Sequence, residues 1–262
     1  MHFQHQFIDL SDKRRVFAIG DIHGKLEPLK HALTQVQFDP TQDALISVGD
    51  LIDCGPDSPN TLHYFASQPW FYAVAGNHEL MMSNALKVWW HAKRDDTQQR
   101  YIDIWFRNGG DWARNQDDDE LRALLEIVEA LPCVITCQVR HNKTIGFAHA
   151  QPHTLNWQEM QTWQGNMLDN PRWIWGRTRI KGEPNKPIIG VDFTVHGHTM
   201  SEKAVCVANS YFIDTASYND YQGAFTLLEL NSEQLSTITP AKDHQDQQKI
   251  TKYINKNSLS LK

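Results

Sequence analysis

Residues 16–24 read VFAIGDIHG, an apolar run followed by a glycine, an aspartate and, two positions later, a histidine. The same design, an apolar run that ends in a glycine and a polar cluster, recurs in residues 44–53, ALISVGDLID, and in residues 71–79, FYAVAGNHE. Short apolar runs bounded by glycine are typical of buried strands. The three segments therefore predict three buried strands, each leading into a loop that carries polar side chains.

The spacing of the polar clusters indicates how these strands are connected. Asp21, Asp50 and Asn77 are 29 and 27 residues apart in the sequence, close to the ~30 residues of a strand, a crossover helix and a return strand. Strands connected in this way run parallel, so their carboxyl ends meet at one edge of the sheet, where side chains distant in the chain converge. We therefore expect βαβ units with a shared site at that edge.

The pattern changes after the third cluster. A helical insert is expected at about residues 80–130, because the periodicity there is helical and ends before Pro132. Residues 133–139 and 144–148 are apolar runs that flank a turn, which predicts a hairpin leading to His149. Further strands are expected at residues 193–195, 211–213 and 223–230.

Composition narrows the class of protein. The chain has 262 residues, 40% of them hydrophobic, and a formal net charge of −6. The acidic balance argues against non-specific nucleic-acid binding, which requires a surplus of Lys and Arg. No apolar run approaches the ~20 residues of a membrane span, and residues 1–10 lack the apolar stretch of a signal peptide. We expect a cytoplasmic protein with no nucleic-acid or membrane partner.

The polar clusters combine residue types that bind divalent ions. The first offers Asp21 and His23, the second Asp50 and the third Asn77. Carboxylates, imidazoles and an amide, without a thiolate, suit Mn, Fe, Zn or Mg. The four cysteines, none in a Cys-x-x-Cys pair, are too few and too scattered for a disulfide framework or a thiolate zinc site.

Each cluster alone has an ordinary explanation, because a Gly-Asp pair after a strand is usually only a turn. Structural needs do not explain three clusters at βαβ spacing, with a histidine two residues after the first aspartate and an aspartate three residues after the second. Two later signals, at His149 and at His196-Gly197-His198, could be a core histidine and a turn. The first three clusters make a role in the same site the better interpretation of both signals.

With these residues in place, the sequence resembles the calcineurin-like metallophosphoesterase superfamily, in particular its bacterial and phage branch of serine/threonine phosphoprotein phosphatases. The resemblance extends to Leu45–Asp50, Asn108–Trp112, Trp175–Arg177 and Ile213–Thr215. It implies an α/β (α+β) fold, a β-sandwich with βαβ units, flanking helices and a helical insert. The later strands would then form a second sheet packed on the first, and the early strands would not belong to one open parallel sheet.

The resemblance also implies domain limits. A catalytic domain of the metallophosphoesterase type would span residues 15–230, with the helical insert at about 80–130. Residues 1–14 would be an N-terminal extension. Residues 231–262, which are polar, would be a C-terminal tail or a helix.

The family's metal ligands map onto this chain position by position. Two divalent ions are implied, with Mn expected ahead of Fe, Zn or Mg, and a hydroxide that bridges the two ions would attack phosphorus in line. Asp50 would bridge the ions. The ligands of the first ion would be Asp21, His23 and Asp50, and those of the second Asp50, Asn77, His149 and His198.

The same resemblance assigns the proton donor. His78 would be the general acid that protonates the leaving group, and Asp53, from the neighbouring loop, would orient it. His196, which on a strand faces the same side as His198, and Asp214 are expected to lie directly behind the ligands.

The substrate-binding arginines depart from the family pattern. That pattern has an arginine directly after Asp53 and another directly before Gly76, but this chain has Cys54 and Ala75. The third phosphate contact would be Arg177. Arg–phosphate hydrogen bonds are among the stronger charge-assisted contacts, so their loss should weaken monoester binding unless other groups replace them. The other candidates are Arg107, Arg179 and Lys181.

Three other residue types carry less information. Cys54 lacks the Cys-x5-Arg loop of cysteine phosphatases, so a filler role is preferred to a redox-sensitive one. Gln151 stands where the family pattern has an aspartate. The tryptophans are interpreted as packing residues and not as a binding platform.

The first interpretation is a dinuclear-metal phosphatase that hydrolyses phosphate monoesters of a phosphorylated protein or a small phosphoester. One alternative is a nucleotide or dinucleoside polyphosphate hydrolase or a phosphodiesterase, which the missing arginines favour. A second is a regulatory protein that keeps the metal site but turns over weakly. The similarities at Asn108–Trp112 and Ile213–Thr215 favour the first. The oligomeric state is left open.

Overall fold

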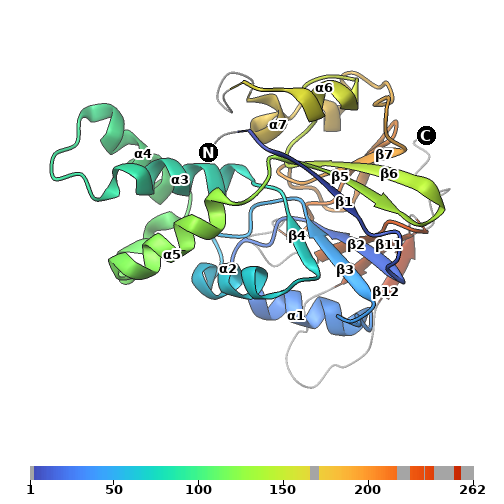
Figure 1. The fold of residues 1–262 in the computed structure, drawn as a ribbon, viewed down its shortest axis with the longest axis horizontal. Coiled ribbons are helices and arrows are strands. Elements are labelled where there is room, and N and C mark those ends of the chain that lie inside the picture. Colours follow the sequence, from blue (N-terminus) through green and yellow to red (C-terminus); the bar gives the residue numbers. More distant parts are fainter. Residues whose placement is uncertain (1–2, 166–170, 217–224, 233, 239–250, 255–262) are drawn as a thin grey trace.

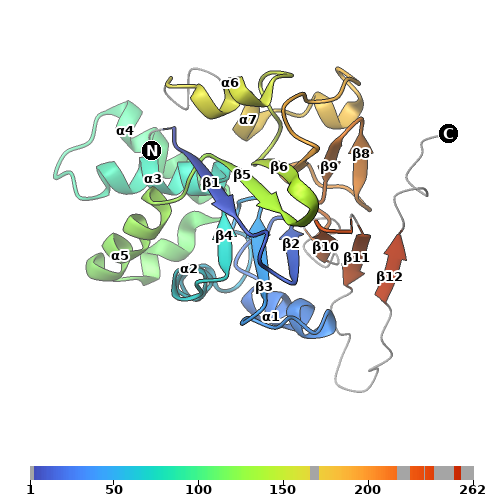
Figure 2. The same cartoon turned by 45° about the vertical axis from the view of Figure 1, so that its right-hand side comes forward.

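The computed structural model describes residues 3–165, 171–216, 225–232, 234–238 and 251–254. In this part of the chain, two six-stranded mixed sheets form the centre of the molecule. Figures 1 and 2 show helices on the outer side of each sheet and a group of helices at one end. The α/β sandwich expected from the family resemblance is confirmed. None of the helices in these ranges is long and apolar enough to cross a bilayer.

The first sheet contains the strands predicted from the three opening segments. Its order is β12-β11-β10-β2-β3-β4. β2, β3 and β4, on one side of the sheet, run parallel, and helices α1 and α2 connect them, as expected for βαβ units. β10 pairs with β2 antiparallel. The bounds are β2 Arg15–Ile19, α1 Leu26–Gln35, β3 Asp43–Ser47, α2 Ser58–Ser67, β4 Phe71–Ala73, β10 Phe225–Glu229, β11 Gln234–Ile238 and β12 Thr251–Ile254.

The second sheet contains the predicted hairpin. Its order is β1-β5-β6-β7-β9-β8, with β5 and β6 antiparallel and β6 and β7 parallel. The short 3-10 helix η2 closes the hairpin. The bounds are β1 His5–Asp9, β5 Val134–Val139, η2 Arg140–Asn142, β6 Lys143–Ala148, β7 Phe193–His196, β8 Val205–Val207 and β9 Ser210–Phe212.

Helices fill residues 77–129, where the sequence predicts a helical insert. Asp95 and Asp117 accept a backbone N–H at the starts of α4 and α5, as N-cap residues do. On the outer side of the second sheet lie two short helices and a 3-10 turn. The bounds are α3 Asn77–Trp89, α4 Asp96–Arg107, η1 Gly110–Asn115, α5 Asp118–Glu129, α6 Trp157–Thr162, α7 Arg172–Trp175 and η3 Arg179–Lys181.

Alternation along the strands builds the layers. Val16 and Ala18 of β2 point into a core between the two sheets, whereas Phe17 and Ile19 point into a core shared with the helices, as the period of two in a strand requires. A third, smaller core places Trp157 and other residues of α6 and α7 on the second sheet. The sheets are therefore covered on both faces, and only their edges can present polar loops.

Two segments outside the expected catalytic domain also contain strands. β1 lies within residues 1–14 and pairs with β5 in parallel. β11 and β12 lie within the expected polar tail or helix, and β11 pairs with β10. These strands are short, β1 and β12 lie at sheet edges and β11 lies between β10 and β12. Backbone pairing therefore defines them more than an apolar pattern does. Residues 233, 239–250 and 255–262 are outside the described residues.

Candidate metal centre

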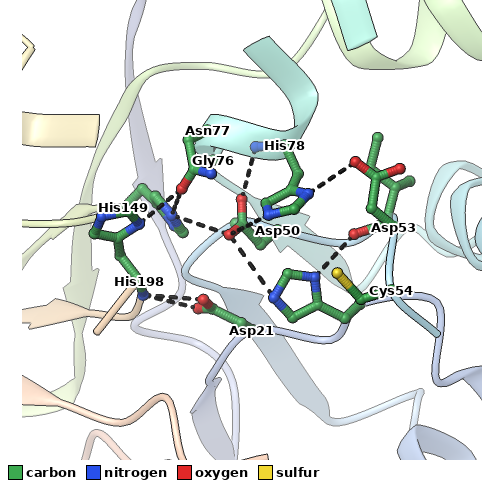
Figure 3. Close-up of polar contacts among 12 residues, drawn as sticks. Asp21, Asp50, Asp53, Cys54, Gly76, Asn77, His78, His149 and His198 are labelled. Atoms are coloured by element: carbon green, nitrogen blue, oxygen red, sulfur yellow. Dashed lines mark hydrogen bonds and ion pairs between the residues drawn. The ribbon is translucent and has the colours of Figure 1, made fainter. Parts of the chain in front are cut away.

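Polar side chains from five strand ends meet at the edge where both sheets end (Figure 3). Asp21, Asp50 and Asn77 follow the parallel strands β2, β3 and β4. His149 and His198 follow β6 and β7, which are parallel in the second sheet. All five side chains are at least 95% buried. The structure therefore brings together residues that are up to 177 positions apart.

Asp50 lies in the middle of this group. Its Oδ2 is 3.3 Å from Nε2 of His149 and 3.9 Å from Nε2 of both His23 and His78. Its Oδ1 accepts a hydrogen bond from the backbone N–H of His78 at 3.0 Å. Burial alone would raise the pKa of Asp50, but the nearby histidines, His149 first, hold it well below its usual value. Asp50 is therefore positioned to face both halves of the site as an anion.

Backbone carbonyls fix the orientation of two histidines. His149 donates from Nδ1 to the carbonyl of Val48 at 2.8 Å, and His23 donates from Nδ1 to the carbonyl of Ile52 at 3.0 Å. The opposite ring nitrogen, Nε2, then faces Asp50 in each case. This arrangement, one nitrogen held by a carbonyl and the other aimed at the site, is typical of metal-binding histidines.

The second half of the group is built around an amide. Oδ1 of Asn77 is 2.9 Å from Nε2 of His149 and 2.7 Å from Nδ1 of His198. Burial lowers the pKa of His23 to about 4 and of His198 to about 3, so these rings are neutral at pH 7 and keep a lone pair.

Asp21 adds a second buried carboxylate. Burial raises its pKa well above the usual value, and the carboxylates of Asp214 and Asp50 raise it further. The backbone N–H of His198 donates to both of its oxygens, at 3.2 and 2.9 Å. Asp214, which sequence analysis placed behind the ligands, lies against Asp21 and is 1% exposed. Buried carboxylates this close to one another need a proton or a positive counter-charge between them.

The donor set fits two divalent cations. One atom from each of Asp21, His23 and Asp50 lies within 4.8 Å of the others, and the same holds for Asp50, His149 and His198. Oxygen and imidazole donors that face one another need a cation or protons between them, and this mixture suits borderline or hard divalent ions. Asp50 is common to both groups.

The loops of the site have a strained backbone. Non-glycine residues with left-handed φ include His23 at 49°, Asp50 at 49° and His198 at 65°. Such conformations cost free energy and cluster at functional sites. Gly76 is required next to them, because a Cβ at this position would collide with Oδ1 of Asp50. The strained loops therefore hold the donor side chains of the site in place.

A histidine and a carboxylate form a separate pair beside the ligands. Nδ1 of His78 is 2.8 Å from Oδ2 of Asp53, and both residues are buried. Burial would lower the pKa of His78, but the carboxylates of Asp50 and Asp53 outweigh it and raise the pKa to about 9. The pair therefore presents Nε2 of a protonated imidazole toward Asp50.

Glu79, the carboxylate next to His78 in sequence, has another task. Its Oε2 accepts the backbone N–H of Gly76 at 2.7 Å and of Asp50 at 3.0 Å, and its Oε1 accepts that of Leu51 at 2.8 Å. It is fully buried at the start of α3. The sequence alone indicates no role for Glu79. Its three bonds join the loop after β3 to the loop after β4.

Replacing Glu79 with glutamine is expected to lower the free energy of unfolding by about 1–3 kcal/mol, because the amide NH₂ cannot accept and one buried N–H loses its acceptor. Denaturant unfolding of the metal-free protein measures the effect. Glu27→Gln is the matched control, because Glu27 is exposed and pairs with Lys30 on the surface, where such pairs contribute little. Equal stability of the two variants would contradict this role of Glu79.

The arginines and the lysine considered for substrate binding differ in their surroundings. Arg177 is exposed, and its charge contributes to the lowered pKa of His198. Arg179 is buried and donates to Ser210 Oγ at 2.7 Å and to the carbonyls of Pro184 and Lys186. Arg179 therefore holds the chain in place, whereas Arg177 is accessible near the site. Arg107 and Lys181 are exposed on α4 and η3.

Two other residues named from sequence form hydrogen bonds with their neighbours. Gln151 accepts the backbone N–H of Thr178 at 3.1 Å and of Arg179 at 2.9 Å, so it anchors the segment that follows Arg177. His196 is buried between the carbonyl of Ala148 and Thr194 Oγ1, at 2.7 and 2.8 Å. Its position behind His149 is indirect, through the backbone.

The position of Ala75 is buried, whereas that of Cys54 is exposed. The backbone N–H of Ala75 donates to the carbonyl of Pro132, and its side chain belongs to the core beside the helices. Sγ of Cys54 lies 3.5 Å from the carbonyl of Asn108. Only position 54 has space for a longer side chain at the surface.

Comparison with known proteins shows which family and which relatives the chain is similar to. The calcineurin-like phosphoesterase family matches residues 14–202. Serine/threonine-protein phosphatase 1 of Salmonella typhimurium is 33% identical over 231 residues, which cover 86% of this chain and 96% of that protein. A symmetrical bis(5'-nucleosyl)-tetraphosphatase of Ectopseudomonas mendocina is 41% identical over 103 residues, 38% of each chain.

A solved structure shows the same fold. A candidate diadenosine tetraphosphatase superposes with a TM-score of 0.60 at 19% identity, covering 92% of this chain and 100% of that chain. The family match spans most of the sequence, and the Salmonella relative matches nearly end to end. On this evidence the chain belongs to the calcineurin-like phosphoesterase family.

Proposed function

We propose that the chain is a dinuclear-metal phosphatase that hydrolyses phosphate monoesters, with phosphorylated proteins or small phosphoesters as substrates. The observation that carries the proposal is the His78–Asp53 pair, 2.8 Å apart, beside a buried donor set centred on Asp50. A proton donor next to a site for two cations is the machinery of phosphoester hydrolysis.

The residues that would hold the ions follow from the two donor groups. Asp21, His23 and Asp50 would hold one, and Asn77, His149 and His198, with Asp50 shared, the other. Bound Mn²⁺ would lower the pKa of a water molecule for attack on phosphorus and neutralise charge on the phosphoryl oxygens. Manganese is proposed because the donors are oxygen and imidazole without a thiolate.

His78 would supply the proton that the leaving group needs. Its Nδ1 is held by Asp53, which leaves Nε2, 3.9 Å from Oδ2 of Asp50, directed at the reacting centre. An alkoxide is a poor leaving group unless it is protonated, so this proton transfer matters most for serine or threonine phosphates. Arg177, exposed beside His198, would bind the substrate phosphate.

The extent of the matches to relatives favours a protein phosphatase over the alternatives. The relative named as a serine/threonine phosphatase matches 86% of this chain, whereas the tetraphosphatase matches 38%. The polyphosphate alternative keeps one supporting feature, since Cys54 and Ala75 stand where the family pattern has arginines that bind a monoester phosphate. A location in the cytoplasm is also proposed, in keeping with four cysteines that form no disulfide.

A substrate panel with added Mn²⁺ tests the proposal. We expect kcat/KM to be higher for phosphopeptides and an aryl monoester than for a diester or a diadenosine polyphosphate. Asp50→Asn, prepared in parallel, reports contaminating phosphatase. Preference for the polyphosphate would favour the alternative hydrolase, and equal rates for wild type and Asp50→Asn would leave a regulatory metal-binding protein.

Replacing Asp53 with asparagine is expected to shift the basic limb of the kcat profile to lower pH by about 1–3 units. The acid must be protonated to act, so activity falls as the pH rises through the pKa of His78. The Asp53 carboxylate raises that pKa, and its removal lowers it. Asp111→Asn, an exposed carboxyl in η1, is the control, and an unmoved limb in Asp53→Asn would exclude the pairing.

A further inference from the structure

Asp53 receives hydrogen bonds from three side chains, only one of which is His78. Trp105 donates from Nε1 to Oδ2 at 3.0 Å, with Oδ1 at 3.2 Å. Trp112 donates from Nε1 to Oδ1 at 2.8 Å. Asp53 is 0% exposed, so no water replaces a missing donor without rearrangement. Both carboxylate oxygens are thus held by donors other than His78.

Both indoles come from the helical insert. Trp105 is a fully buried residue of α4, and Trp112 lies in η1 and is partly buried. Their rings meet edge to face, with centroids 5.6 Å apart. Segments that flank a short turn therefore place two N–H groups on one carboxylate.

The glycines of the turn make this convergence possible. Gly109, which separates α4 from η1, has a φ of +95°, a conformation that side chains rarely adopt. A Cβ at Gly110 would collide with the indole of Trp105. The Asn108–Trp112 segment thus has a physical purpose, because it turns the chain tightly enough for both indoles to reach Asp53.

An indole N–H only donates, so it can hold Asp53 only as an acceptor. It is also neutral, and it does not compete with His78 for the charge of the carboxylate as an arginine would. Three donors leave the carboxylate one orientation, and this orientation sets that of the imidazole. Groups that orient an active-site residue in this way are typically worth 10–100-fold in activity at metal sites.

We propose that Trp105 and Trp112 are positioning residues for the proton donor, so that the helical insert is part of the active site and not only a structural addition. This proposal rests on the proposed function and adds two residues to its active site. Burial raises the pKa of Asp53, and the hydrogen bonds from His78 and the two indoles oppose that rise.

The test compares Trp112→Phe and Trp105→Phe, which remove the N–H and keep most of the ring volume. On an alkyl phosphate we expect kcat to fall about 10-fold or more, with KM unchanged. On an aryl phosphate, whose leaving group needs little protonation, the fall should be several-fold smaller. Trp157→Phe is the control, because this buried indole donates to Thr136 Oγ1 at 2.8 Å on the second sheet, away from the site.

A double-mutant cycle separates positioning from packing. In the Asp53→Asn background, Trp112→Phe should cause no further loss of kcat, because the indole acts only through the carboxylate. The same loss in both backgrounds, or equal losses with alkyl and aryl substrates, would overturn the inference. If Trp105→Phe does not fold, Trp112→Phe, whose ring is only partly buried, carries the test.

The controls separate a failure of the proposed function from a failure of the role of the two indoles. A wild-type protein with no activity on any monoester would remove the proposed function itself. An active wild type whose Trp112→Phe variant keeps full kcat on the alkyl phosphate would remove only the role of the indoles. Circular dichroism and the thermal midpoint of each variant, compared with Trp157→Phe, show whether a loss of kcat comes from unfolding.

Discussion

Asp50→Asn is expected to abolish turnover and to reduce bound Mn²⁺ from two ions per chain to one or none. Asp50 is the one residue common to both donor groups. Its Oδ2 lies 3.3 Å from Nε2 of His149. An asparagine keeps the shape and can still accept the backbone N–H of His78, but it removes the negative charge that two neighbouring cations would share.

Metal binding can be measured without any assay of activity. A ligand that binds only the folded state stabilises it by RT ln(1 + [L]/Kd), about 2.7 kcal/mol when the ligand is at 100 times its Kd. Added Mn²⁺ should therefore raise the Tm of the wild type and have little effect on that of Asp50→Asn. Asp12→Asn, at an exposed carboxyl, should respond like the wild type. An equal rise of Tm in Asp50→Asn would remove Asp50 from the metal centre.

The strands that local sequence predicts are those with buried apolar runs. β2, β3 and β4, and the β5–β6 hairpin, all follow from such runs and from the spacing between them. β1 does not, because the sequence HQFID gains its structure from edge pairing with β5. Pairing across more than a hundred residues leaves no local signal. β11 pairs with the neighbouring strand β10, but its sequence, QLSTI, is largely polar and contains no apolar run.

The site shows the same division between local and long-range information. The positions of Asp21, Asp50 and Asn77 follow from their places after parallel strands, which is a local property. The bonds of Glu79 to backbone N–H groups of the neighbouring loop depend on how two loops meet in space. Sequence alone could not separate this role from that of a catalytic carboxylate.

The roles of the tryptophans and arginines are even harder to predict from the sequence. Trp112 lies in a segment that marked the family, but a tryptophan is more often a packing residue, and nothing local indicates that its N–H reaches Asp53. Arg177 and Arg179 are two positions apart and equally suited to a phosphate by type. Burial separates them, because Arg179 spends its donors on Ser210 and on backbone carbonyls.

His78→Ala is expected to lower kcat on an alkyl phosphate by about 10²–10⁴-fold, the usual contribution of a positioned acid. Both Mn²⁺ ions should remain bound, because His78 belongs to neither of the donor groups centred on Asp50 and its partner is Asp53. Equilibrium dialysis or the Mn²⁺-dependent rise in Tm checks retention of the metals. This result is the reverse of that for Asp50→Asn, in which the metals are lost.

The leaving group supplies the control within the same protein. An aryl phosphate departs as a stabilised phenolate and needs little protonation, so His78→Ala should lose much less activity on it than on the alkyl ester. His78→Asn, which can still donate a hydrogen bond but cannot transfer a proton at neutral pH, should resemble His78→Ala in kcat. An unchanged rate on the alkyl phosphate would remove His78 from the mechanism. The same loss on both substrates would assign His78 to substrate binding, because proton transfer is the step that depends on the leaving group.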